Sequence, residues 1–391
     1  MKDSRQRQKM DEKMKPVKKI SEIYRQSKPG FTLLELLVAS AVMLIVILGT
    51  LSLYMRSNKI SVDQQQIAEI QHDVRTSMFF ISRDVRSAGV GLTLDIAGYF
   101  LEGKDGFGPA PESSDYIKLL GNFDDPLAIK IRQYQGGGGG GAATAFLYEF
   151  ELENSPYECP DYYENRNVII VSTKCPGCFA FRYVPQNSVF GCGSGVAHIN
   201  MQPGQSELNP PGGLVDTGCS GDCYDDGILT FGQIKQYWLD TTGNPGDYPG
   251  LNLTLGQDGY LGLPNVLYLT TVDDSGTISH MPLAQNIENL QFQYNLVDGS
   301  GNFLGFSDWQ DTWTQDDISR IRQVRIWILG KTPKPMVSIS ANVPANLYLY
   351  RRPAVANSPA AGQADRHRRF LLDSTVNIRN LTLNIYNTGT R

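Results

Sequence analysis

Histidine is scarce in this chain of 391 residues: there are four, at 72, 198, 280 and 367, and no two have the spacing of a metal-binding pair. The sequence also lacks a nucleophile elbow, a paired-carboxylate signature and a Cys-His catalytic pattern. Six consecutive glycines, 136–141, are not followed by Lys-Ser/Thr, so we expect a flexible loop and not a phosphate-binding one. These absences favour a protein that is not an enzyme, with no cofactor and no metal ion.

A net positive charge is confined to the first 30 residues. Residues 1–30 carry a net charge of +6, whereas residues 31–391 carry −11. This balance excludes a chain-wide basic surface, so we expect no nucleic-acid partner, and we interpret the Arg-rich stretches 351–352 and 366–369 as local solvated patches. A basic leader before an acidic body indicates targeting.

One apolar run follows the leader. Residues 31–54 contain a single charged side chain, Glu35. As a helix they would span roughly 36 Å, enough to cross a bilayer core of about 30 Å. The basic residues on the leader side place residues 1–30 in the cytoplasm and the body outside. A carboxylate inside a membrane helix is costly, so Glu35 either reaches the interface or has a partner, such as a free amino group on Phe31.

The helix is expected to continue beyond the membrane. Residues 55–88 contain no proline and no glycine, and Gly89 ends the pattern. Apolar side chains recur every three or four residues, opposite a polar face that includes Asp63 and Asp84. The apolar positions are Ile60, Ile67, Ile70, Val74, Met78, Ile81, Val85 and Ala88.

The residues after 88 favour β-strands. Together with the helix they predict an α+β fold: a long N-terminal helix, first transmembrane and then amphipathic, packed on an antiparallel β-sheet. Short helical turns are expected at 283–290 and 315–322. The predicted strands are 116–120, 127–131, 145–152, 168–173, 179–184, 228–231, 266–271, 290–296, 324–329, 347–350 and 370–383.

A large loop-rich insertion is expected at about 155–265, because glycine supplies 16 of the residues 191–265. All six cysteines lie there, which predicts up to three disulfides in a chain that leaves the cytoplasm. Fifteen pairings are open, among them a small Cys219–Cys223 loop, and Cys175-Pro-Gly-Cys178 also admits a zinc or redox motif. The disulfide candidates are Cys159, Cys175, Cys178, Cys192, Cys219 and Cys223.

Two acidic clusters raise the question of calcium, since loops rich in carboxylates can bind it. They lie at 222–226 and 308–317, the second beside Trp309 and Trp313. Neither has the EF-hand spacing, so we interpret both as solvated loops. The two tryptophans, with Phe303 and Phe306, favour packing over a carbohydrate platform.

The junction Gly30-Phe31-Thr32-Leu33-Leu34-Glu35, followed by the apolar run, resembles the class III signal of type IV pilins and pseudopilins. The resemblance implies that a prepilin peptidase cuts after Gly30 and that Phe31 is then N-methylated. It also implies that Glu35 registers the subunit in the filament.

Five later stretches resemble minor pilin assembly proteins of the PilW type, in the order in which that family carries them, whereas 130–265 resembles nothing we can name. These stretches are 71–75, 84–89, 287–294, 321–326 and 369–380. The resemblance implies four parts: a cleaved leader 1–30, a transmembrane half-helix 31–54, an amphipathic half-helix 55–88 and a periplasmic β-rich body 89–391.

The family implies a non-catalytic minor pilin that takes part in initiating type IV pilus assembly in a tip complex. Its partners would be the prepilin peptidase, other minor and major pilins, and inner-membrane lipid. It would sit in the inner membrane with a single pass, and then in a pilus or pseudopilus. Two alternatives stay open: a J-type pseudopilin of type II secretion, and a tip adhesin whose insertion binds surfaces.

Overall fold

The structure is a computed structural model of the chain. It describes residues 30–90, 100–109, 114–123, 128–136, 142–148, 163–175, 178–191, 197–203, 219–248, 251, 253–256, 258–273, 277–336, 349–360 and 364–378. The chain divides into two compact units, Met1–Ser61 and Val62–Arg391.

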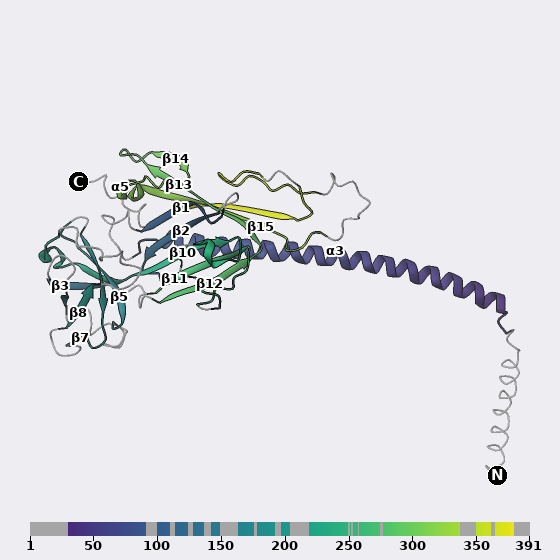
Figure 1. Ribbon diagram of the computed structural model, residues 1–391, viewed down its shortest axis with the longest axis horizontal. Helices are drawn as coiled ribbons and strands as arrows, with labels where there is room; N and C mark the ends of the chain where they lie inside the picture. Colours follow the sequence, from purple (N-terminus) through teal and green to yellow (C-terminus); the bar gives the residue numbers. More distant parts are fainter. Residues whose placement is uncertain are drawn as a thin grey trace, which may run out of the picture. The chain divides into compact units, whose positions relative to one another are not determined.

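One long helix, α3 (Leu33–Ser87), begins in the first unit and ends in the second (Figure 1). It confirms the expected helix over 31–88 almost to the residue. Within the first unit every helical side chain is exposed, and the mean hydropathy of the most apolar stretch is 2.6. By length and composition α3 can cross a bilayer, so its first part fits the expected membrane anchor.

The second unit contains three antiparallel sheets in the described part of the chain, which confirms the α+β class. The first has five strands in the order β1 (Leu101–Phe107), β2 (Ser114–Gly121), β10 (Gln233–Asp240), β11 (Val266–Val272) and β12 (Ile278–Gln285). The second has four, in the order β14 (Phe303–Ser307), β13 (Ile287–Val297), β15 (Ile321–Lys331) and β16 (Arg369–Asn377). The third has seven, in the order β4 (Ala143–Leu147), β3 (Ala128–Gly136), β9 (Ile228–Phe231), β5 (Arg166–Val171), β6 (Phe179–Val184), β8 (His198–Pro203) and β7 (Val189–Phe190).

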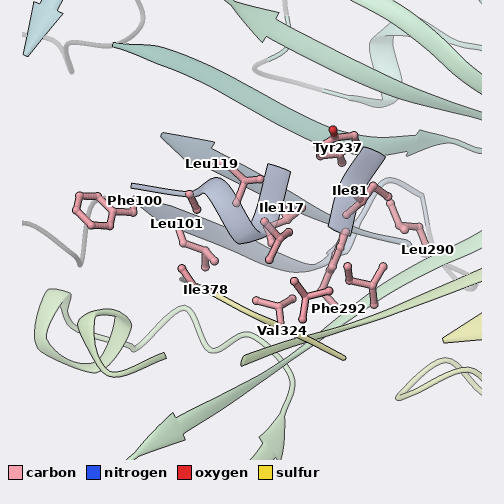
Figure 2. Packing of buried hydrophobic residues seen from close by; sticks show 14 of the residues in the cluster. Ile81, Phe100, Leu101, Ile117, Leu119, Tyr237, Leu290, Phe292, Val324 and Ile378 are labelled. Carbon is pink, nitrogen blue, oxygen red and sulfur yellow. The ribbon is translucent and has the colours of Figure 1, made fainter. Parts of the chain in front are cut away.

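The main core forms where the second half of α3 meets the five- and four-stranded sheets (Figure 2). Helix residues Ile70, Val74, Ile81 and Val85 are almost fully buried, as the helical period predicts. Ile117, Leu119 and Tyr237 join them from the five-stranded sheet, and Leu290, Phe292 and Val324 join them from the four-stranded one. The helix therefore lies against two sheets and not against one.

Helix and sheet approach closely at Gly330 on β15. A Cβ atom there would lie 2.5 Å from Cγ2 of Ile70 and 2.8 Å from Cγ2 of Val74. No larger residue fits without moving the helix, because real Cβ contacts are not this short.

The prediction of which helix residues are buried and which are exposed is partly wrong. Ile60 is exposed, whereas Asp63 and Asp84 are only 2% exposed. Asp84 is stabilised by the five-stranded sheet: the Tyr237 hydroxyl donates to Oδ2 at 2.6 Å, and Nζ of Lys235 lies 3.5 Å from the same oxygen. The polar pattern misleads here because a second sheet covers this side of the helix and supplies partners for the carboxylate.

Most expected strands are present, but several real strands were missed. Strands β1, β7, β8, β10, β12 and β14 fall outside the predicted ranges. The helical turn expected at 283–290 is wrong, since β12 and β13 occupy those residues, whereas the turn at 315–322 is confirmed by α5 (Gln315–Ser319). Of 347–350 only 349 and 350 are described, and Tyr350 forms an isolated bridge with Asp365.

The region expected to be an irregular insertion is more ordered than predicted. The strands of the seven-stranded sheet lie between Ala128 and Phe231, and they enclose a core of their own that includes Tyr163, Val168 and Leu229. Strand β10, also within 155–265, is the middle strand of the five-stranded sheet. The chain thus leaves the first sheet after β2 and returns to it at β10.

A buried carboxylate joins the two sheets that hold α3. Asp115 on β2 accepts hydrogen bonds from the backbone N–H of Gly106 at 3.1 Å and from that of Phe292, on β13, at 2.9 Å. Burial outweighs these two donors and raises the pKa of Asp115 to about 8.

We predict that this group makes the fold less stable as pH rises. The unfolded chain releases the proton near pH 4 and the folded chain near pH 8, so the contribution of Asp115 is fully present below pH 4 and is lost between the two values. Replacing Asp115 by Asn should flatten the pH dependence of the unfolding free energy over this window, measured by urea unfolding of the detergent-solubilised chain. An unchanged slope between pH 4 and pH 8 would contradict this role.

Candidate functional site

The start of α3 is built around Thr32 and Glu35. The Thr32 N–H donates to Oε2 of Glu35 at 2.9 Å, and the Thr32 hydroxyl donates to the same oxygen at 3.0 Å. The Glu35 N–H donates in return to Oγ1 of Thr32 at 3.2 Å. This reciprocal pair is a capping box, which fixes the first turn of the helix. The Thr-Leu-Leu-Glu pattern at 32–35 is the sequence signal of this cap.

Gly30 and Phe31 lie immediately before the cap. Gly30 has open space around the position of a Cβ atom, and Phe31 is 85% exposed. The bond between them is therefore accessible, and cutting it would leave the Thr32–Glu35 cap intact. A new amino group on Phe31 would lie one residue before that cap, close along the chain to the only carboxylate of the apolar run.

Two hydroxyl groups on the exposed part of the helix form hydrogen bonds to backbone carbonyls, as is suitable for an apolar environment. The hydroxyl of Ser40 donates to the carbonyl of Leu37 at 2.9 Å, and that of Thr50 donates to the carbonyl of Ile47 at 2.9 Å. Such bonds satisfy hydroxyl groups where no water is present. Small side chains on this stretch permit close approach of a second helix; they are Ala39, Ser40, Ala41 and Gly49.

Four of the six candidate cysteines form two disulfides, Cys175–Cys223 and Cys178–Cys219. Both bonds join the loop after β5 to the segment around η2 (Gly221–Tyr224). Cys159 and Cys192 lie outside the described residues. The small Cys219–Cys223 loop is excluded, and Cys175 and Cys178 each bond to a distant partner and not to each other. This pairing is that of a structural staple and not that of a redox-active CxxC.

Among the described residues, the one group whose ligand atoms lie close enough for a metal ion is Cys175, Cys178 and Cys223, and all three are in disulfides. The first acidic cluster serves structure instead. Asp225 accepts the N–H of Tyr134 at 2.8 Å, and Asp226 accepts the Tyr148 hydroxyl at 2.8 Å. The hydrogen bonds from Tyr148 and Lys174 lower the pKa of Asp226, so it is ionised at neutral pH.

The tryptophan pair and one arginine of the basic stretch 366–369 have partners within the fold. Trp309 and Trp313 contact each other edge to face and both contact Tyr294, so they belong to the core margin. In the basic stretch, Arg369 lies between Glu288 at 2.6 Å and Asp365 at 2.8 Å, so much of its charge is neutralised.

Comparison with protein families gives two matches. The prokaryotic N-terminal methylation motif matches residues 25–51, and the type IV pilus-assembly protein W family, PilW, matches residues 256–380. Neither the curated proteins nor the solved structures give a match. The two family matches confirm the resemblance to PilW-type prepilins that the sequence indicated.

The matched ranges correspond to definite parts of the fold. The first covers the capping box and the start of the apolar run, and the second contains β11, β12, the whole four-stranded sheet and α5. The seven-stranded sheet and both described disulfides lie outside both ranges. The family likeness therefore covers the anchor and part of the scaffold around α3.

We predict that the two disulfides stabilise the seven-stranded sheet non-additively, because both join the same two segments. Breaking Cys175–Cys223 alone opens only a small additional loop, which should lower the unfolding free energy by about 2–3 kcal/mol. Breaking the second bond as well releases a chain segment of more than 40 residues and should cost about 4 kcal/mol more.

The measurement is urea unfolding of C175S/C223S and of C175S/C178S/C219S/C223S, with hydrogen exchange of β5 and β9 amides as the local readout. The buried strands of the five-stranded sheet serve as the internal control, because neither disulfide has a cysteine on them. Equal losses on the first and the second step would contradict the shared-segment account.

Proposed function

We propose that this chain is a minor pilin of the PilW type, non-catalytic, that takes part in initiating type IV pilus assembly, in a complex at the pilus tip. The observation that carries the proposal is the combination of a prepilin methylation motif at 25–51 with a PilW match at 256–380. The second match names a pilus-assembly family, and this favours a pilus over the pseudopilus of type II secretion.

The proposed course begins with residues 1–30 as a cytoplasmic leader. A prepilin peptidase cuts between Gly30 and Phe31 and methylates the new amino group. Residues 31–54 hold the subunit in the inner membrane, residues 55–88 carry the helix into the body, and residues 89–391 form that body in the periplasm. The exposed, accessible bond before the cap supports the cleavage step.

Assembly then transfers the apolar helix from lipid to other pilin helices. Its side chains are exposed in the described part of this chain, so burial against neighbouring helices is available to them. Glu35 is the charged group of this surface. In an apolar bundle it needs a cation, and the Phe31 amino group of its own or a neighbouring subunit is the candidate.

We predict that Glu35→Gln separates processing from assembly. Glutamine also completes a capping box, so the start of the helix and the cleavage site should be retained, whereas the charge that pairs with the amino group is lost. The variant should be cut after Gly30 like the wild type, but its amount in sheared filaments should fall at least tenfold. Immunoblots of filament and membrane fractions measure both.

The matched control is Glu69→Gln, which removes a carboxylate from the same helix. Glu69 is exposed and bonded to Gln65 at 2.9 Å, beyond the apolar run. Its variant should enter filaments at the wild-type level. Wild-type incorporation of the Glu35 variant would contradict the proposed pairing.

A further inference from the structure

A cavity of about 510 Å³ opens on the face of the five-stranded sheet that points away from α3. Side chains alternate along each strand, so Ile117, Leu119 and Tyr237 point to the helix while Lys118 and Gln236 point into the cavity. Its size is typical of small-molecule sites. It lies outside the disulfide-bearing sheet and outside the N-terminal anchor.

The floor of the cavity is a polar row that crosses four strands. Cross-strand register pairs Glu102 on β1 with Lys118 on β2, Lys118 with Gln236 on β10, and Gln236 with Thr270 on β11. Such a row across a sheet gives side chains spaced by about 5 Å, which suits a ligand with polar groups along its length.

Apolar side chains flank this row on both sides. On one side lie Phe107 and Tyr116, whose rings meet edge to face with centroids 4.9 Å apart. On the other side lie Ile234, Val272 and Ile278. The cavity therefore offers a polar strip between two apolar walls.

Several polar groups are held in place by the protein. The Tyr116 hydroxyl donates to Oε1 of Glu102 at 2.6 Å, and Nζ of Lys118 donates to Oε2 at 3.2 Å. The hydroxyl of Thr270 lies 2.8 Å from Nε1 of Trp238 and 2.7 Å from Nδ1 of His280. These groups are preorganised, which lowers the cost of binding.

Other polar groups keep free bonding capacity. The half-buried amide of Gln236 has no hydrogen-bond partner in the described part of the chain, although it lies at the centre of the row. Lys104, also on the cavity wall, has only a long ion pair of 3.9 Å with Asp311. Two lysines, Lys104 and Lys118, balance two carboxylates, Glu102 and Asp247, so the lining carries no net charge.

We propose that this cavity binds a neutral saccharide. Hydroxyl groups both donate and accept, and so they match a row that runs from a carboxylate through a lysine and an amide to a hydroxyl. The apolar faces of a sugar ring match the walls formed by Phe107 and Tyr116 and by Ile234 and Val272. A lining without net charge favours a neutral ligand over a charged one, and the polar row disfavours a purely apolar one. This inference goes beyond pilus assembly and does not rest on it.

The test is saturation-transfer NMR on the full chain in a detergent that has no sugar headgroup. The probes are glucose, galactose, mannose, N-acetylglucosamine, N-acetylgalactosamine, lactose and chitobiose, with N-acetylneuraminic acid as the charged comparison. At least one neutral sugar should receive saturation. Gln236→Leu, which removes the free amide, should weaken its binding about fivefold, as expected for one lost hydrogen bond.

The control is Gln202→Leu, an exposed strand glutamine on β8 outside the cavity, which should bind like the wild type. Three results would overturn the proposal: no neutral sugar receives saturation, the charged sugar binds more tightly than every neutral one, or the two leucine variants bind equally well.

Discussion

The structure depends on one contact: the apolar face of the second half of α3, held between two antiparallel sheets. Ile70, Val74, Ile81 and Val85 are buried there, and each contributes about 1.5–3 kcal/mol by leaving water. Gly330 permits a close approach of the helix to β15, and the Asp84 carboxylate, with Tyr237 and Lys235, fixes the end of the helix to β10. Without this helix the two sheets would expose their inner faces.

This arrangement explains how one helix can serve two environments. Its first part is an almost wholly apolar run, and every described helical side chain in the first compact unit is exposed. Its second part is apolar toward the core, and its buried Asp84 carboxylate has partners on a strand of the five-stranded sheet. The PilW match includes the whole four-stranded sheet, which is one of the two sheets that the helix packs against. The seven-stranded sheet is added between β2 and β10, and its two described disulfides pack against its hydrophobic core.

Much of this fold was predictable from local pattern. The helix follows from its apolar run and period, and β11, β13 and β15 follow from runs of β-branched and aromatic residues. Strand β10 was missed because Gln233, Lys235 and Asp240 interrupt its apolar pattern, and its partner Asp84 lies about 150 residues away in the chain. Local sequence carries no information on such a partner.

The candidate sites also divide into those that a local motif predicts and those that only the fold brings together. The Gly30-Phe31 junction and Glu35 are contiguous, so a short motif suffices to find them. The polar row from Glu102 to Thr270 depends on strand register, and the disulfide pairing depends on how the loop after β5 folds against the segment around η2. Both bring distant residues together only after folding. Sequence could name the cysteines but not their partners, and it gave no sign of the cavity.

The central claim is that this chain is processed at its helix start and then enters a pilus. The most direct measurement is the mass of the N-terminal peptide of the wild-type protein, taken separately from sheared filaments and from membranes. The account predicts a terminus at Phe31 carrying one methyl group, present in the filaments. An intact segment from Met1 to Gly30 in both fractions would contradict it and would leave α3 as a plain membrane anchor.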